Sequence, residues 1–258
     1  MERCRILASG WWSESDVSVI WSDRFFHLPT QWQAEADAFW DGQQSRGYFN
    51  GKMARLCGWR VQDHHLHIEL ETTDYKTLLF GNHCADILAE GYEAVLSGAL
   101  GVSALVRSSD GQLVLMKRSA QVGEYPLCYD LFGGHIDAGL QSGRNSLFRA
   151  MERELEEELG LPASRYTLHC FGLLETRDRR KPELLFAARS RHTAAELGRL
   201  AENARDAHEF EHILILADDE RAINVFLHDH DTISPSAYGC LFLYSQLRVT
   251  YERQAQAF

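Results

Sequence analysis

The segment AMERELEEELGL, residues 150–161, gathers five glutamates and an arginine on one predicted helix and reaches glycine at position 160. At about 100° per residue, Glu154, Glu157 and Glu158 project from one narrow sector of that helix. The remaining side, which we expect to face water, carries Arg149, Glu152, Arg153 and Glu156. The sector next to the acidic trio is apolar and predicts contact with a core, through Leu147, Phe148, Met151, Leu155 and Leu159.

This placement of acids beside a buried stripe has an electrostatic cost. Like charges three and four residues apart destabilise a helix by about 0.2–0.5 kcal/mol per pair, and burial adds to the cost. A hard divalent cation such as Mg²⁺ or Mn²⁺ would offset it, because such ions prefer oxygen ligands and complete their shell with water and phosphate. The alternative is a solvated acidic helix in which Arg149 and Arg153 pair with its glutamates.

Composition restricts the classes of function. The chain has 258 residues, 45% of them hydrophobic, and a net charge of −11 with a pI near 5.5. It lacks the basic field that nonspecific nucleic-acid binding requires, so we expect no nucleic-acid partner. Its six cysteines are scattered without metal-ligand spacing, which favours reduced thiols in a cytoplasm. No apolar run suggests a signal peptide or a membrane span, so we expect a cytoplasmic protein without membrane contact.

The first part of the chain, residues 1–95, reads as a smaller unit. Thr30 is placed to cap a helix that ends near Gly42, and residues 52–61 and 65–71 have the pattern of strands. Residues 72–83, TTDYKTLLFGNH, interrupt the alternation and predict a loop that presents Tyr75 and Phe80.

Residues 96–258 predict a denser mixture of strands and helices. Two apolar strands flank Asp110-Gly111, a strong hairpin signal, and a third, residues 127–132, leads into Gly133-Gly134-His135. Further strands are predicted at 167–176, 183–190 and 212–217. Thr193 with Glu196 forms a capping box, Asp218 or Asp219 can cap another helix, and Pro235 can start the last one. The pattern predicts an α+β protein with a mixed sheet between helix layers.

The strand, the Gly-Gly-His loop and the acidic helix together resemble the Nudix hydrolase signature, G-x5-E-x7-R-E-U-x-E-E-x-G-U with U aliphatic. Residues 153–161 match every fixed position of its second half. The first half departs from the pattern. Counted from Gly134, the first glutamate falls on Leu140; counted back from Arg153, it falls on Asn145, with Gly139 as the glycine.

Several further segments resemble the UDP-glucose diphosphatase branch of this superfamily, in which an insertion interrupts the signature. They are FNGKMARL (49–56), DYKTLLFGN (74–82), KRSAQVGEYP (117–126), DLFGGHID (130–137), AHE (207–209) and SPSAYG (234–239). The resemblance implies a Nudix α/β/α sandwich at 96–258 and an N-terminal α+β domain at 1–95 that contributes to substrate binding.

The resemblance also implies roles for individual residues. Glu154 and Glu158, assisted by Glu157, would hold Mg²⁺ or Mn²⁺, and Arg153 would belong to the catalytic signature. An aromatic ring can stack on a base, and arginine can bind phosphate with two N–H groups. The implied substrate-binding residues are Phe49 and Tyr75 for the uridine and sugar, Arg118 and Gly123 for the diphosphate, Asp130, His135 and Asp137 for sugar hydroxyls or phosphate, and Ser236 for the far wall.

The implied reaction is hydrolysis of UDP-glucose, or UDP-galactose, to UMP and a sugar 1-phosphate. The residues leave the general base open among Glu154, Glu209, His208 and His135. Two other functions remain in view. One is a Nudix diphosphatase for ADP-ribose or dinucleotides. The other is a non-catalytic Nudix fold that senses a nucleotide sugar, which loss of the first signature glutamate would favour.

Overall fold

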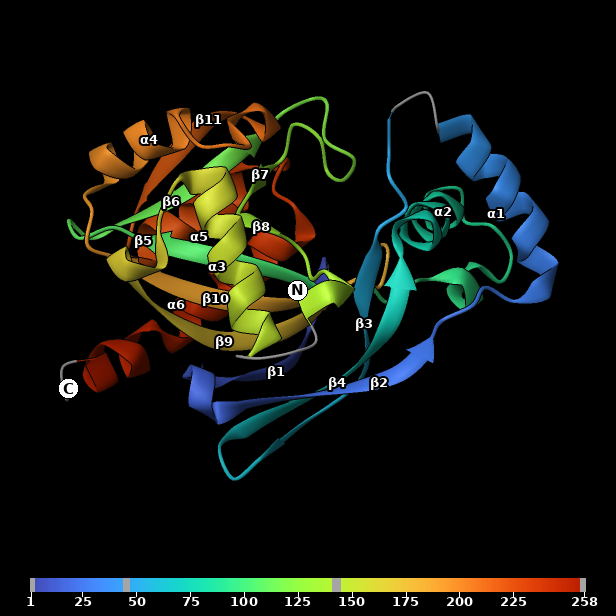
Figure 1. The fold of residues 1–258 in the computed structure, drawn as a ribbon. Helices are drawn as coiled ribbons and strands as arrows, with labels where there is room; N and C mark the ends of the chain where they lie inside the picture. Colours follow the sequence, from blue (N-terminus) through green and yellow to red (C-terminus); the bar gives the residue numbers. More distant parts are fainter. Residues whose placement is uncertain (1–2, 44–46, 141–144, 256–258) are drawn as a thin grey trace.

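The computed structural model describes residues 3–43, 47–140 and 145–255, which form two β-sheets and their covering helices (Figure 1). The helices in this part of the chain are α1 Thr30–Gln43, α2 Tyr75–Asp86, α3 Ser146–Leu159, α4 Ala194–Glu202, α5 Glu220–Asp229 and α6 Pro235–Ala255. The strands are β1 Cys4–Trp12, β2 Val17–Phe25, β3 Lys52–Gln62, β4 His65–Asp74, β5 Gly101–Arg107, β6 Gln112–Arg118, β7 Tyr129–Asp130, β8 Phe132–His135, β9 Tyr166–Thr176, β10 Pro182–Ser190 and β11 Phe210–Ala217.

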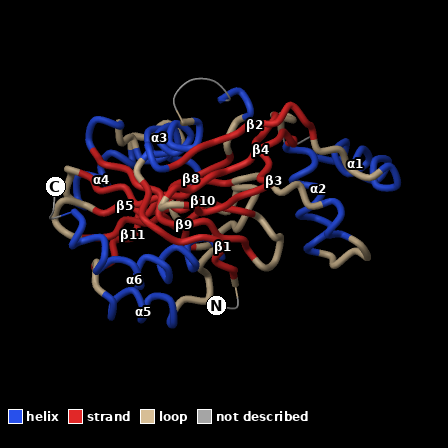
Figure 2. The backbone as a smooth tube through the Cα atoms, turned by 90° about the horizontal axis from the view of Figure 1, so that it is seen from below, coloured by secondary structure: helices blue, strands red, loops and turns tan. Residues whose placement is uncertain are grey.

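The larger sheet has the order β1-β9-β10-β5-β6-β11, and β8 pairs with β5 while β7 pairs with β6. Strands β10 and β5 are parallel and the other pairs are antiparallel, so the sheet is mixed. Side chains alternate between its faces. In β5, Val102 and Ala104 join the apolar core under α3, whereas Leu105 joins the core under α5 and α6. Figure 2 shows the sheet between these helices, which confirms the predicted α/β/α sandwich.

The smaller sheet has the order β2-β4-β3, with β2 parallel and β3 antiparallel to β4. Helices α1 and α2 pack beside it around Ala36 and Phe80. The predicted boundary near residue 95 does not account for β1, however, because this strand pairs with β9 in the larger sheet. Apolar residues of both sheets, including Leu66 and Leu147, also share one core.

The prediction of a loop at residues 72–83 is wrong, because the chain ends β4 at Asp74 and then forms α2. The Asp74 carboxylate accepts the N–H of Thr77 at 2.8 Å and caps the helix. The sequence of α2 shows no clear helical repeat of apolar residues, because Leu78 and Phe80 pack into different hydrophobic clusters. Gly81, which suggested a turn, lies inside the helix; a Cβ there would come 2.8 Å from the carbonyl oxygen of Val95.

The predicted strand at 127–132 is also shorter in the structure. Leu127 has a positive φ of 61°, and the chain pairs as β7 at Tyr129–Asp130 and again as β8 after Leu131. Three predicted helix boundaries are confirmed. Gly160 ends α3 with φ 66°, the Thr193–Glu196 capping box starts α4, and Asp219 caps α5.

All six cysteines are free thiols. Among the residues that the structure describes, no helix combines the length and the hydropathy needed to cross a membrane.

The pairing of β8 with β5 depends on the absence of a side chain at Gly133. A Cβ there would lie 2.1 Å from the carbonyl oxygen of Val102 and 2.8 Å from Cα of Ser103. Both are backbone atoms of the central strand and cannot move aside independently.

We therefore expect Gly133→Ala to destabilise the protein by several kcal/mol, because overpacking a rigid site typically costs about 1–3 kcal/mol or more. Gly198→Ala in α4 is the matched control, since nothing lies within 4 Å of a Cβ at that position. Alanine there should leave the free energy of unfolding unchanged or raise it by up to about 1 kcal/mol. Urea unfolding of both variants measures the difference, and equal stabilities would contradict the expectation.

Candidate active site

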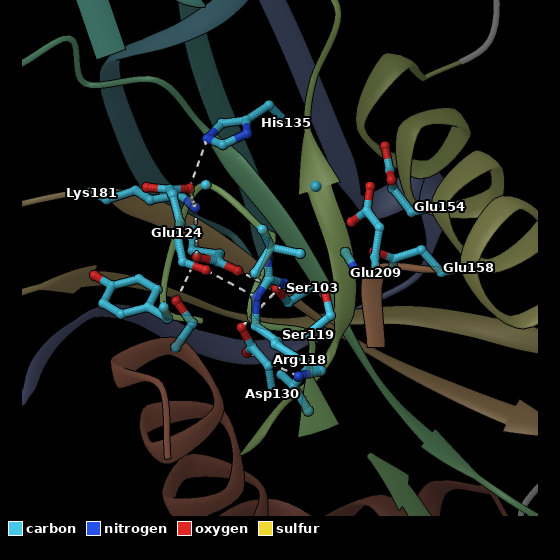
Figure 3. Close-up of a pocket in the computed structure, with 18 of the residues that line it drawn as sticks. Ser103, Arg118, Ser119, Glu124, Asp130, His135, Glu154, Glu158, Lys181 and Glu209 are labelled. Atoms are coloured by element: carbon cyan, nitrogen blue, oxygen red, sulfur yellow. Dashed lines mark hydrogen bonds and ion pairs between the residues drawn. The ribbon is translucent and has the colours of Figure 1, made fainter. Parts of the chain in front are cut away.

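A pocket of about 500 Å³ opens between α3, the β8 turn and the segments that follow β6 and β9 (Figure 3). It brings together nine of the predicted catalytic and substrate-binding residues: Tyr75, Arg118, Gly123, Asp130, His135, Arg153, Glu154, Glu158 and Ser236. His208 and Glu209, two of the candidate bases, also line it. Phe49, Asp137 and Glu157 are not among its lining residues. The pocket therefore draws on both the N-terminal region and the larger sheet.

One wall is acidic and consists of Glu154 and Glu158 from α3 with Glu209, which lies just before β11 (Figure 3). Glu158 is only 2% exposed, and its Oε2 accepts the N–H of Gly133 at 2.7 Å. Gly134 leaves room for Glu154, whose Oε2 would lie 2.7 Å from a Cβ on that glycine. The two glycines thus allow β8 to pass close to the acidic face of α3.

Burial and mutual repulsion perturb these carboxyl groups. Burial raises the pKa of Glu158 well above its ordinary value, and the neighbouring Glu154 and Glu209 raise it further. Burial also raises the pKa of Glu154, although Arg153 donates a hydrogen bond to its Oε1 at 2.8 Å and opposes the shift. Because a buried like-charge cluster disfavours ionisation, this wall would be stabilised by a cation.

The third acid of the predicted trio, Glu157, turns away from the pocket. It forms ion pairs with Arg205 and, across 3.9 Å, with Arg153. Arg153 does not simply face water as its helical position suggested. Its guanidinium group reaches Glu154 and donates to the carbonyl oxygen of His135 at 3.3 Å, so it holds α3 against the β8 turn.

The middle of the pocket contains Arg118 and Asp130. Arg118 Nη1 lies 3.5 Å from Asp130 Oδ2, and Arg118 Nε donates to the carbonyl oxygen of Glu124 at 3.1 Å. Asp130 Oδ1 accepts the hydroxyl of Ser234 at 2.6 Å. The arginine is therefore held in place from two sides, with its remaining N–H groups available to a ligand.

The sequence reasoning missed three lining residues of the pocket, Glu124, Lys181 and Glu183. Figure 3 shows Glu124 and Lys181 on the side away from Glu154 and Glu158. Lys181 Nζ donates to Glu124 Oε2 at 2.9 Å. Burial alone would raise the pKa of Glu124, but Lys181 and its other cationic neighbours outweigh burial and lower it. Glu124 lies in the segment KRSAQVGEYP, beside the predicted Gly123, and that adjacency was the available signal.

His135 stands next to this cluster as a neutral ring. Its Nε2 lies 3.6 Å from Glu124 Oε2. Burial, reinforced by Lys181, lowers the pKa of His135 to about 4. At neutral pH the imidazole can therefore donate or accept a hydrogen bond but carries no charge.

An aromatic pair lines another part of the pocket. Tyr75, at the start of α2, packs edge-on against Tyr48 with ring centroids 5.6 Å apart. Burial raises the pKa of Tyr75 to about 12, so its hydroxyl stays protonated. A Cβ at Gly123 would lie 3.3 Å from that hydroxyl. The predicted Phe49 is 84% exposed, and the preceding residue, Tyr48, takes its place in the pocket.

The first half of the signature has a structural role here. Asn145, at the place of the missing glutamate, accepts the N–H of Leu147 at 3.1 Å and caps α3. Asp137 accepts the N–H of Gly139 at 2.7 Å and lines a separate groove with Lys52 and Thr72. Leu140, the other candidate position, precedes residues 141–144, which lie outside the described residues.

The sandwich fold and the acidic helix beside a Gly-Gly turn define a class of protein. Comparison with known proteins identifies this class. A model of the NUDIX domain matches residues 99–228, half of the chain, and the chain belongs to the Nudix family. It is 27% identical over 244 residues to Nudix hydrolase 9 of Arabidopsis thaliana, covering 76% of each chain. It is 36% identical over 87 residues to an uncharacterized Nudix hydrolase of Nostoc, covering 33% of this chain and 48% of that protein. A structure of a MutT protein from Methanosarcina mazei superposes with a TM-score of 0.40 at 16% identity, over 58% of this chain and 94% of the other.

Nudix hydrolases generally use divalent metal ions. The acidic wall has side chains of the chemical type that binds such an ion. It offers several carboxylate oxygens, and its like charges already disfavour full ionisation. In the described part of the chain, no three His, Cys, Asp or Glu side chains yet stand close enough to hold an ion. Glu154 points to Arg153 and Glu158 to Gly133, so metal binding would require these side chains to reorient.

The raised pKa of Glu158 leads to a test of stability without metal. The folded protein binds a proton at Glu158 more tightly than the unfolded chain does. The contribution of this group to stability therefore decreases as pH rises from the pKa of the unfolded chain to the higher pKa of the folded protein. Glu158→Gln removes the charge and can still accept the N–H of Gly133. In the presence of a chelator at pH 8, we expect this variant to be more stable than the native protein by about 1–3 kcal/mol.

Thermal unfolding at pH 8 and at pH 4.5 measures this effect, and the difference should shrink at the lower pH. Added Mg²⁺ should raise the melting temperature of the native protein and change that of the variant much less. A variant that melts below the native protein at pH 8 would show that the Glu158 carboxylate is not destabilising.

Proposed function

We propose that this protein is a metal-dependent hydrolase that cleaves the diphosphate of a nucleotide sugar, with UDP-glucose or UDP-galactose as substrate and UMP and a sugar 1-phosphate as products. The observation that carries the proposal is the composition of the pocket. It combines a carboxylate wall suited to a metal–diphosphate complex with an aromatic pair and a set of buried hydroxyl, carboxylate and ammonium groups.

Charge supports a metal-assisted reaction. Six acidic side chains line the pocket, against two arginines and one lysine. A diphosphate would add further negative charge to this excess, so it would bind poorly without a divalent cation. Glu154 and Glu158, with Glu209, would hold Mg²⁺ or Mn²⁺ once the two helix carboxylates turn from Arg153 and Gly133. The ion would neutralise phosphate oxygens and lower the pKa of water.

The protein's own groups would then orient the substrate. Arg118 can donate hydrogen bonds to phosphate oxygens, and Tyr48 and Tyr75 can contact the base and its ribose. The water oxygen forms a bond to one phosphorus, the bridging P–O bond breaks, and the bridging oxygen leaves with the other phosphate. The water proton passes to a nearby base, for which Glu154, Glu209, His208 and the neutral His135 are candidates.

One observation favours the second candidate, a Nudix fold that binds a nucleotide sugar without turning it over. Asn145 occupies the place of the first signature glutamate and serves as a helix cap. Glu154 and Glu158 remain in the pocket, which favours catalysis. Direct measurement of turnover separates the two functions.

Phosphorus NMR of UDP-glucose with Mg²⁺ in ¹⁸O-labelled water should show UMP and glucose 1-phosphate, with the label in the product whose phosphorus was attacked. ADP-ribose and a dinucleotide should be hydrolysed more slowly in the same assay. Binding of UDP-glucose without any product would establish the sensor instead, and preference for ADP-ribose would overturn the nucleotide-sugar assignment.

Substitutions on α3 should separate the acidic wall from the rest of the helix. We expect Glu154→Gln and Glu158→Gln each to lower kcat at least about a hundredfold, because each removes charge next to the reacting diphosphate. Glu156→Gln changes an exposed glutamate of the same helix and should retain native activity. Equal activity in all three variants would exclude the acidic wall from the reaction.

A further inference from the structure

Lys181 and Glu183 form a pair on the pocket wall away from the acidic helix, and the functional roles described above do not use them. The two residues are separated by one position, so on an extended chain their side chains point to the same side. They pass over Gly101 of the neighbouring strand, where a Cβ would lie 3.2 Å from both Lys181 Cε and Glu183 Cδ. The missing side chain at Gly101 provides the space through which both reach the pocket.

Glu183 is buried and Lys181 is largely so, and both have fixed partners, but their hydrogen-bonding capacity is only partly used. Among the described residues, the Lys181 ammonium donates one hydrogen bond, to Glu124, and Glu183 Oε2 lies beyond that range at 3.8 Å. Glu183 is 4% exposed and accepts the hydroxyls of Ser103 and of Ser236, the latter at 2.5 Å. An ammonium group has three donors and a carboxylate about four acceptor sites, so both can bind a ligand as well.

The charge at this wall suits a neutral ligand with many hydroxyls better than a second anion. Glu124 and Glu183 carry two negative charges against the one of Lys181, and His135 is neutral at pH 7. Arg179 also approaches Glu124, but its charge is matched by Asp86, which accepts two hydrogen bonds from it. A phosphate here would meet two carboxylates. A sugar hydroxyl both donates and accepts, so it can bind an ammonium and a carboxylate side by side.

We propose that Lys181 and Glu183 form the subsite that binds the sugar hydroxyls of the substrate. This subsite rests on the proposed hydrolysis of a nucleotide sugar. It places the sugar on the wall opposite Glu154 and Glu158, where the diphosphate binds, and it assigns specificity to two residues that the family signature does not contain.

Glu124 is the positioning residue of this subsite. It holds the Lys181 ammonium, and its other oxygen accepts the side-chain N–H of Asn82 from α2 at 3.0 Å. Arg179 Nη1 lies 3.7 Å from the same carboxylate. Glu124 therefore acts on the ligand through Lys181, and it joins the ammonium to two other segments, its own after β6 and α2.

The experiment compares binding of the sugar with binding of the nucleotide and phosphates in the full-length, metal-loaded enzyme. KM is measured for UDP-glucose, and the inhibition constant is measured for UDP, which lacks the sugar. Lys181→Met and Glu183→Gln should each raise KM for UDP-glucose by about tenfold to a hundredfold, the usual effect of losing a charge-assisted hydrogen bond. The inhibition constant of UDP should stay within about threefold of the native value.

The matched control is Arg180→Met, which removes a positive charge from the adjacent residue. Arg180 is half exposed, pairs with Glu175 outside the pocket and should not change either constant. Thermal unfolding of every variant verifies folding. If Lys181→Met proves unstable, Glu183→Gln remains, since its amide oxygen can accept one serine hydroxyl and its NH2 group can donate to the oxygen of the other serine.

The positioning role of Glu124 has its own readout. Glu124→Gln should raise KM for UDP-glucose in the native background and have no further effect when added to Lys181→Met, because the two changes remove one interaction. Additive effects would show that Glu124 does not act through Lys181.

Three results would overturn the subsite. The first is a parallel rise of KM for UDP-glucose and of the UDP inhibition constant, which would place the pair at the phosphates. The second is an unchanged KM in both variants, which would show no contact with substrate. The third is an absence of nucleotide-sugar hydrolysis by the native enzyme, which would remove the proposed function itself and is recognised from the unsubstituted protein alone.

Discussion

The close approach of α3 to β8 is the constraint on which the pocket depends. Gly133 lies against the backbone of β5, and Gly134 lies against the carboxylate of Glu154, so neither position has room for a side chain. The N–H of Gly133, on the same turn, donates to Glu158. Backbone and acidic face are thereby joined without an intervening layer of side chains, and the carboxylates are fixed at the edge of the central sheet rather than in bulk water.

This arrangement buries like charges that a stable fold would otherwise avoid. Arg153 offsets part of the repulsion at Glu154, and Arg205 forms an ion pair with Glu157. Among the described residues, Glu158 forms no ion pair and accepts only the N–H of Gly133. The remaining cations of the pocket are bound elsewhere, Arg118 to Asp130 and Lys181 to Glu124. The pocket thus has one acidic wall with too few cations and an opposite wall whose charges are paired with one another. Such an asymmetry can bind a ligand that is charged at one end and neutral at the other.

The sequence was sufficient for the parts of the fold that local interactions determine. The amphipathic period of α3, its Gly160 end and the Asp110-Gly111 hairpin all depend on residues close in the chain. The far wall of the pocket could not be read in this way, since its contacts join residues 57 and 80 positions apart. Helix α2 was missed because its apolar residues serve two different clusters. Strand β1 was not predicted, and its partner, β9, lies more than 150 residues further along the chain.

The N-terminal region is consequently a structural part of the pocket rather than an appendage to the Nudix domain. Tyr48 and Tyr75 supply its aromatic surface, and Asn82 of α2 holds Glu124. Asp86 of the same helix forms two hydrogen bonds with Arg179, which also approaches Glu124. The segment between β6 and β7 is thereby bound both to α2 and to the residues before β10. The width of the pocket therefore depends on how the two sheets pack against each other. A change in that packing would alter the wall that contains Lys181 and Glu124. It would also reach the start of α3, because Asn145 and Ser146 are hydrogen-bonded to Val17 and Trp21 of β2.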